Sequence, residues 1–337
     1  MNHIFIYSNL INEKIYMIVK NKDTVIKKNK NKNKGACLYC NDYKGDGNTY
    51  NYNNITINDL DIHYLEHHNL IKFTLYEKIC NINVDTDNHI TFLNIDTNAF
   101  NIIDGLYQEG SKQIYIDNNK NVFNSNTNRY SEHYGYILFN KSKIDKIITL
   151  NQFRISKNDP LIFLPKQNVE LLKQKCIFHT HPMTPYIGSR FKNGIIYEFP
   201  SIMDINHFIE HHNRGELQLS LIITPEGLYI IRKRIFNKDK IIIDNDIFIN
   251  EIERIYKQCL YEVMEKYKNS IIFDIKKYKI NDKYFYKYIA SNIEHLTIIN
   301  HFLEKYDIVI DFYSRIPIKN NNNKINYIFS DIYIPYI

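Results

Sequence analysis

Two histidines separated by one residue, at the end of a short apolar run, constrain this chain more than any other feature. The run Lys175-Cys-Ile-Phe-His-Thr-His has no glycine or proline before Pro182 and predicts a buried strand. Because side chains alternate between the two faces of a strand, His179 and His181 point to one side and Thr180 to the other. Two imidazoles about 6 to 7 Å apart along one face can bind a single metal ion. The pair alone fits equally well with two histidines that are packed or solvated at a strand end.

A carboxylate farther along the chain favours the metal-binding alternative. Ser201-Ile-Met-Asp204 opens a segment, residues 201–212, that we predict to be helical, with Asp204 in its first turn. The same four residues fit a capping box, in which Ser201 is the N-cap and Asp204 the third helical residue. The two interpretations are compatible, because a cap fixes where the helix begins and therefore where Asp204 points. Two histidines and one aspartate leave a tetrahedral zinc ion with one open position, which is typical of catalytic zinc sites.

Glu132 is the candidate general base of such a site. It precedes the apolar run Tyr134-Gly-Tyr-Ile-Leu-Phe139, which predicts a strand, and it is not itself an expected ligand. Zinc lowers the pKa of a bound water to about 7, and a base must then take the proton and pass it to a leaving amine. Taken alone, Glu132 has the properties of an ordinary surface glutamate.

Together these elements resemble the JAB/MPN domain in its active form, the JAMM zinc metalloprotease. Glu132 with Gly135, His179-Thr-His-Pro182 and Ser201-x-x-Asp204 match the three parts of the family motif. Residues 218–231 resemble the strand, turn and strand that follow the metal-binding helix in such domains, and the resemblance covers about residues 85–236. The implied fold is of the α/β (α+β) class, with a curved mixed β-sheet flanked by helices.

The resemblance also implies roles for individual residues. His179, His181 and Asp204 hold zinc, Glu132 acts first as general base and then as general acid, and Ser201 donates a hydrogen bond to the developing oxyanion. The implied activity is hydrolysis of an isopeptide bond to ubiquitin or a ubiquitin-like modifier. The chain departs from the family in the spacer of residues 183–200, which is longer than usual. This spacer predicts either a flap over the site or a passive surface insertion.

A second constellation, near the N-terminus, resembles a Cys2His2 zinc finger. Cys37-Leu-Tyr-Cys40 suits a zinc knuckle, and His63 and His67 fall one helical turn apart. The spacer of residues 41–62 is longer than the about 12 to 15 residues usual for such fingers. His68 is an alternative to His67 as fourth ligand, and two free cysteines beside a histidine-rich helix are the alternative to a finger.

Composition limits the remaining choices. The 337 residues contain 44% hydrophobic residues, enough for a sizeable core, and an odd number of cysteines, five, which argues against a disulfide framework. We expect no signal peptide and no membrane span, and therefore a cytoplasmic or nuclear protein. We expect four parts: N-terminal strands and a basic linker in residues 1–36, the finger in 37–70, the MPN/JAMM domain in 85–240, and a mainly helical C-terminal region in 241–337.

Three functional hypotheses follow. The first is a JAMM-type isopeptidase that acts on ubiquitin or a ubiquitin-like conjugate, and the second is a JAMM hydrolase of a different amide. The third is a nucleic-acid-binding finger protein that uses the MPN domain as a scaffold. The lysine-rich run of residues 27–34 is the feature that supports nucleic acid, and such a run is more often a solvated linker. The complete set of site residues favours the two hydrolases.

Overall fold

The computed structural model contains two compact units. The larger unit comprises residues 98–140 and 144–312, and the smaller one residues 1–97, 141–143 and 313–337. Among the helices that the structure describes, none is both long and apolar enough to cross a membrane. The described residues are 5–7, 49–52, 55–68, 70–72, 75, 92–112, 129–155, 162–166, 168–183, 198–234, 237–267, 273–274, 279–280, 285–286, 290, 294–319, 325–329 and 332–335.

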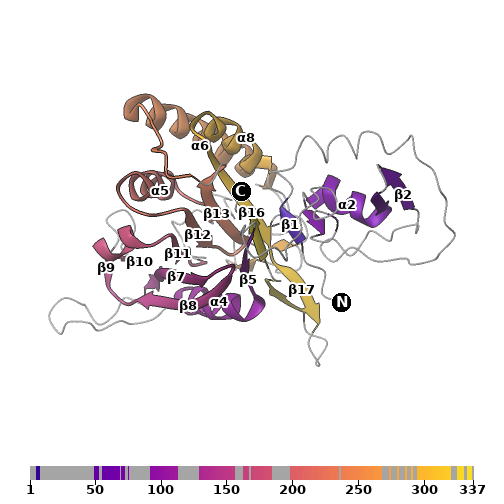
Figure 1. Ribbon diagram of the computed structural model, residues 1–337, viewed down its shortest axis with the longest axis horizontal. Coiled ribbons are helices and arrows are strands. Elements are labelled where there is room, and N and C mark those ends of the chain that lie inside the picture. Colours follow the sequence, from indigo (N-terminus) through magenta and orange to yellow (C-terminus); the bar gives the residue numbers. More distant parts are fainter. Residues whose placement is uncertain are drawn as a thin grey trace. The chain divides into compact units, whose positions relative to one another are not determined.

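The larger unit is built on a curved mixed sheet (Figure 1), in which the strands follow the order β16-β13-β12-β11-β7-β8. Strand β11 runs parallel to β12, whereas β7 is antiparallel to β11 and β13 is antiparallel to β12. The sheet and the helices described below confirm the mixed α/β class expected from the sequence. The strands are β7 (Tyr134–Asn140), β8 (Lys143–Leu150), β11 (Cys176–Thr180), β12 (Leu219–Ile223), β13 (Gly227–Lys233) and β16 (Ile308–Ser314).

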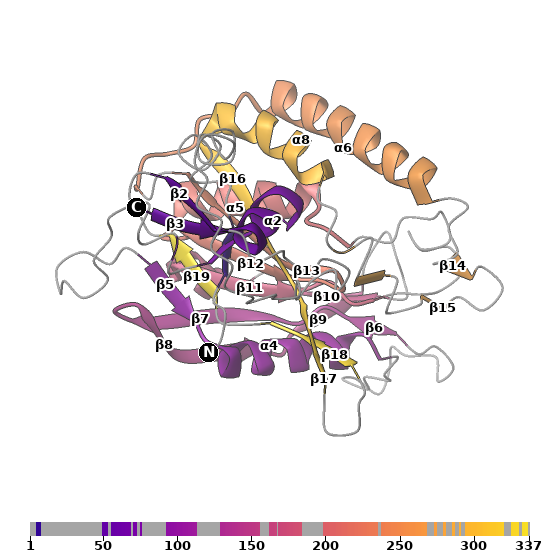
Figure 2. The same cartoon turned by 90° about the vertical axis from the view of Figure 1, so that its right-hand side faces the viewer.

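Helices cover both faces of this sheet (Figures 1 and 2). Helix α4 lies on one side, and α5, α6 and α8 lie on the other. The helical segments are α4 (Thr97–Gly110), α5 (Ile202–Arg214), α6 (Asn245–Tyr267) and α8 (Glu294–Leu303), with 3-10 turns η3 (Val169–Lys173) and η6 (Glu304–Tyr306).

The centre of the core is formed by β12 and β13, in which every residue is buried. Their sequences, Leu-Ser-Leu-Ile-Ile and Gly-Leu-Tyr-Ile-Ile-Arg-Lys, are nearly continuous apolar runs. A strand that is covered on both faces needs apolar side chains on both, so such a run is typical of a central strand between helical layers. The strand, turn and strand predicted for residues 218–231 are present.

Short strands complete the larger unit. One small sheet has the order β6-β10-β9, with β6 parallel and β9 antiparallel to β10. Strands β14 and β15 form an antiparallel pair. The bounds are β6 (Tyr130–Ser131), β9 (Phe153–Ile155), β10 (Ile162–Pro165), β14 (Phe273–Asp274) and β15 (Lys279–Ile280).

The smaller unit contains strands in the order β5-β19-β1-β4, two antiparallel strand pairs and helix α2. Helix α2 (Asp59–His68) carries both His63 and His67, as the finger hypothesis requires, and the side chain of His63 is buried. The strands are β1 (Phe5–Tyr7), β2 (Thr49–Tyr52), β3 (Ile55–Asn58), β4 (Leu70–Lys72), β5 (Phe92–Ile95), β17 (Ile316–Lys319), β18 (Ile325–Ile328) and β19 (Ile332–Pro335).

The C-terminal region combines helices with strands. The amphipathic pattern of residues 245–267 predicts a helix, and α6 has these bounds. A second helix, expected near residues 284–306, is shorter in the described part of the chain, where α8 and η6 together span residues 294–306. Strands β14 to β19 also lie in residues 241–337. The sequence of β16 is rich in β-branched and aromatic residues, which favour a strand. The four-part division of the sequence stays a prediction.

A buried ion pair joins two strands of the larger unit, β13 and β16. Arg232 Nε lies 2.6 Å from Asp311 Oδ2, and both side chains are almost fully buried. Replacing Asp311 by alanine leaves the Arg232 guanidinium buried without its carboxylate, which typically costs about 3 to 5 kcal/mol. We therefore expect the Asp311→Ala variant to unfold at a much lower urea concentration than the wild type. Glu253→Ala, which removes the exposed pair with Lys257, is the control and should change stability by less than about 1 kcal/mol.

Candidate metal centre

The two histidines lie where strand β11 ends. His179 belongs to β11, and His181 directly follows its last residue, Thr180. The backbone N–H of His181 donates to the carbonyl of Ile223 in β12 over 2.8 Å, so the chain stays extended beside β12. The two imidazole rings lie on the same side with their centroids 5.0 Å apart. The alternation expected from the sequence is confirmed.

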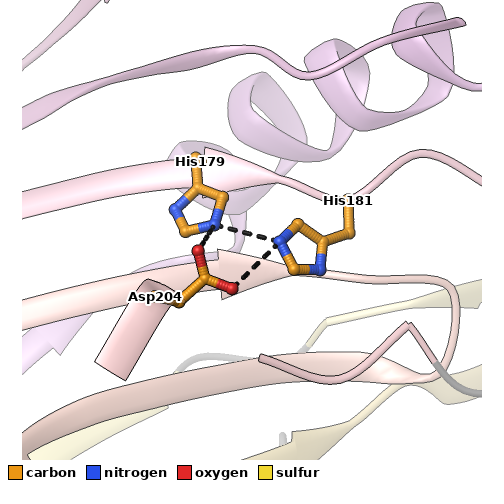
Figure 3. A group of neighbouring side chains, drawn as sticks. All are labelled: His179, His181 and Asp204. Atoms are coloured by element: carbon orange, nitrogen blue, oxygen red, sulfur yellow. Dashed lines mark hydrogen bonds and ion pairs between the residues drawn. The ribbon is translucent and has the colours of Figure 1, made fainter. Parts of the chain in front are cut away.

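Asp204 completes a group of three side chains (Figure 3). The two Nε2 atoms of His179 and His181 are 3.1 Å apart. The carboxylate oxygens of Asp204 lie 3.2 Å from His179 Nε2 and 3.4 Å from His181 Nε2. Ligands about 2.0 Å from a tetrahedral metal ion are about 3.3 Å from one another, so these spacings suit one shared ion. The group could therefore hold a metal ion.

A backbone carbonyl fixes the orientation of the His181 ring. Its Nδ1 lies 2.7 Å from the carbonyl oxygen of Glu198. A carbonyl only accepts hydrogen bonds, so Nδ1 carries the proton and Nε2 is the atom directed at His179 and Asp204. Histidines that bind metals usually donate their second ring N–H in this way. The donor set and its support thus both fit a metal ion.

Charge pairing keeps Asp204 ionised. Burial alone raises the pKa of the Asp204 carboxyl, but the rings of His179 and His181 outweigh burial and hold that pKa well below its usual range. Burial lowers the pKa of His181, but the Asp204 carboxylate outweighs it and raises the pKa of His181 to about 9. The Asp204 carboxylate is therefore anionic at neutral pH.

The start of helix α5 holds Asp204 in place. The Ser201 backbone N–H donates to Asp204 Oδ2 over 2.6 Å, and the Asp204 backbone N–H donates to Ser201 Oγ over 3.2 Å. These are the two reciprocal bonds of the predicted capping box. The Ser201 hydroxyl also donates to Asp204 Oδ2 over 2.8 Å. Its proton must turn away from Asp204 before it can bind another oxygen.

Glu132 lies in the short connection between strands β6 and β7. Its backbone N–H donates to the carbonyl of Phe163 in β10 over 2.9 Å, and β7 begins two residues later, at Tyr134. Burial raises the pKa of the Glu132 carboxyl above its ordinary value, and the nearby charges of His181 and His179 offset only part of that rise. Glu132 is thus close enough to the histidines for their charges to act on it.

Two supports of the site were not foreseen from the sequence. Thr180, which points away from the histidines, accepts a hydrogen bond at Oγ1 from the backbone N–H of His133 over 3.0 Å. The Thr180 N–H donates back to the His133 carbonyl over 2.9 Å, so β11 holds the residue that follows Glu132. On the other side, the Tyr256 hydroxyl of α6 donates to the carbonyl of Pro200 over 2.9 Å. Both pairs, Thr180 with His133 and Tyr256 with Pro200, are far apart in the chain, and no local sequence pattern predicts these contacts.

Other predicted site residues lie outside the described residues. These are Cys37 and Cys40 of the finger, the lysine-rich run of residues 27–34, and residues 184–197 of the long spacer. Of the finger residues, His63, His67 and His68 lie on α2. The finger, its fourth ligand and the function of the spacer stay predictions.

A comparison with known proteins places the chain in a family. It is 34% identical over 260 residues to "Uncharacterized protein R413" of Acanthamoeba polyphaga mimivirus. The aligned region covers 76% of this chain and 69% of R413. This chain belongs to the family of R413. No protein-family model and no solved structure matches the chain.

Proposed function

We propose that the chain is a zinc-dependent isopeptidase of JAMM type that removes ubiquitin or a ubiquitin-like modifier from its conjugates. The observation that carries the proposal is the convergence of His179, His181 and Asp204, with Nε2 atoms and carboxylate oxygens spaced for one ion. Nitrogen and oxygen donors of this kind, three in number, suit a catalytic zinc site. The family motif of the sequence adds Glu132 and Ser201 to this set.

Each residue has a separate task in the proposed reaction. Zinc, when bound by the two histidines and Asp204, makes water a stronger acid and polarises the scissile carbonyl. Glu132 takes the proton of the attacking water and delivers it to the leaving amine. Burial favours this task, because it raises the pKa of the Glu132 carboxyl group and so makes its carboxylate a stronger base.

Ser201 has two tasks in this proposal. Its backbone N–H and its hydroxyl both donate to the Asp204 carboxylate and so fix the position of that carboxylate. When the hydroxyl turns from Asp204, it can donate to the oxygen that gains negative charge in the transition state.

The same arrangement of residues would also suit a hydrolase of other amides, and substrate assays distinguish this activity from the isopeptidase activity. Diubiquitin and a small amide should therefore be tested side by side, each with and without a chelator.

Metal analysis tests the centre directly. The purified chain should contain zinc, and His179→Ala should lose the ion of this centre because it removes one of three protein ligands. His207→Ala is the matched control, since His207 is an exposed histidine of α5 and is not one of the three ligands. If the finger is also present, the wild type should carry about two zinc ions, and changing Cys37 and Cys40 to serine should remove only one. Equal zinc content in the wild type and His179→Ala would contradict the proposal.

A further inference from the structure

Glu226 is a buried carboxyl group in a turn, where glutamates are normally exposed. It lies between β12 and β13, and its side chain has no exposed surface. Hydrogen bonds between the residues that flank Glu226 close this turn. The Thr224 backbone N–H and hydroxyl both donate to the Gly227 carbonyl, over 2.8 and 3.0 Å. Burying a carboxylate is costly unless donors compensate for the lost water. The position of Glu226 therefore needs an explanation.

The carboxylate of Glu226 binds the segment that leads into the metal centre. The backbone N–H of Glu198 lies 3.0 Å from Oε1 and 3.2 Å from Oε2 of Glu226. The Tyr229 hydroxyl also donates to Oε1, over 3.0 Å. Both oxygens of the carboxyl group face this one amide, so the Glu198 N–H is held in place even though burial raises the pKa of Glu226 to about 7.

The carbonyl of the same residue, Glu198, accepts the Nδ1–H of His181 over 2.7 Å. Only the two backbone dihedral angles of Glu198 separate its N–H, held by Glu226, from its carbonyl, which holds His181. Downstream, Phe199 is buried against Tyr256, and the Pro200 carbonyl is bound by the Tyr256 hydroxyl. The peptide that orients His181 is thus fixed on one side by Glu226 and on the other by α6.

We propose that Glu226 is a positioning residue of the metal centre, which holds the Glu198 peptide so that its carbonyl keeps His181 protonated on Nδ1 and its Nε2 directed at the metal. This role rests on the proposed function only in requiring that His179, His181 and Asp204 bind a metal ion. Glu226 itself neither touches the ion nor takes part in proton transfer. Losses of supporting partners of this kind typically weaken metal binding about 10- to 100-fold.

Cobalt(II) is the probe that tests this role, because its visible spectrum reports the geometry of the ligands around the ion. Glu226→Leu removes the acceptor for the Glu198 N–H while keeping a similar volume. Glu226→Gln keeps an acceptor oxygen and is the conservative rescue. Tyr229→Phe removes a different hydrogen bond to the same carboxylate, so it is the control for a change in the buried cluster that leaves the link to His181 intact.

We expect Glu226→Leu to bind cobalt about 10- to 100-fold more weakly than the wild type and to change its visible spectrum, whereas Glu226→Gln and Tyr229→Phe stay within about threefold. A folded Glu226→Leu chain with wild-type affinity and spectrum would overturn the inference and leave the metal centre intact. A wild type that binds no cobalt would instead overturn the metal centre of the proposed function. If Glu226→Leu does not fold, Glu226→Asp decides, because its shorter side chain draws the carboxylate away from Glu198. Weaker cobalt binding by Glu226→Asp than by Glu226→Gln supports the role, and equal binding overturns it.

Discussion

Glu132→Gln should lower the turnover of an isopeptide substrate at least about 10²-fold while the metal content stays at the wild-type level. Glutamine keeps the size of the side chain and its ability to form hydrogen bonds, but it cannot take a proton. Because Glu132 is not one of the three side chains spaced for the ion, its replacement should not release zinc. Steady-state kinetics and metal analysis of the same preparation check both parts.

The pH profile gives this prediction a second readout. Burial raises the pKa of Glu132, and a general base works only when ionised. Wild-type activity should therefore fall as the pH drops through that raised pKa, and the residual activity of Glu132→Gln should lack this acid limb. Glu216→Gln, which makes the same chemical change at an exposed glutamate paired with Lys238, is the control. Unchanged turnover in Glu132→Gln with metal still bound would rule out Glu132 as the base.

Gly135→Ala should unfold the larger unit or destabilise it by at least about 4 kcal/mol. A Cβ atom at Gly135 would lie 1.9 Å from the carbonyl oxygen of Ile148 and 2.9 Å from two ring carbons of Phe178. A backbone oxygen of a neighbouring strand cannot move aside as a flexible side chain can. Gly135 thus lets β7, which follows Glu132, pack closely on Phe178 of β11.

Gly105→Ala is the matched control for this effect. Gly105 lies within helix α4, and a Cβ added there meets nothing within 4 Å. Alanine is favoured over glycine in a helix interior, so this variant should be as stable as the wild type or more stable by up to about 1 kcal/mol. Urea unfolding of both variants measures the difference. Equal stability of the two variants would show that β7 can shift, against the packing described above.

Local sequence patterns were sufficient to predict those parts of the fold and of the candidate site that depend on residues close together in the chain. Alternation along β11 put His179 and His181 on one side, and the serine and aspartate of a capping box located the start of α5. The apolar spacing of residues 245–267 located α6. Each of these features depends on residues within one strand or one helix, where the geometry of that element determines which side chains share a face.

Long-range supports could not be predicted in this way. Glu226 is 28 residues from Glu198, Thr180 is 47 from His133, and Tyr256 is 56 from Pro200. In the sequence, Glu226 stands in a Thr-Pro-Glu-Gly turn, whose composition predicts an exposed loop. Its carboxyl group is buried and accepts the Glu198 N–H from the segment before α5, a contact that only the tertiary structure reveals.

The capping box of α5 makes the helix start and the candidate ligand inseparable. Asp204 Oδ2 accepts the Ser201 amide, while Oδ1 of the same carboxylate faces His179. Local opening of the first turn of α5 would therefore pull Asp204 away from both histidines. The Ser201 and Asp204 amide hydrogens form the two bonds of the capping box, so an opening that lets them exchange with solvent also displaces Asp204 from the histidines. An ion bound at the candidate centre would therefore slow their exchange. The free energy of binding an ion at this site would therefore also stabilise the first turn of α5 against local opening.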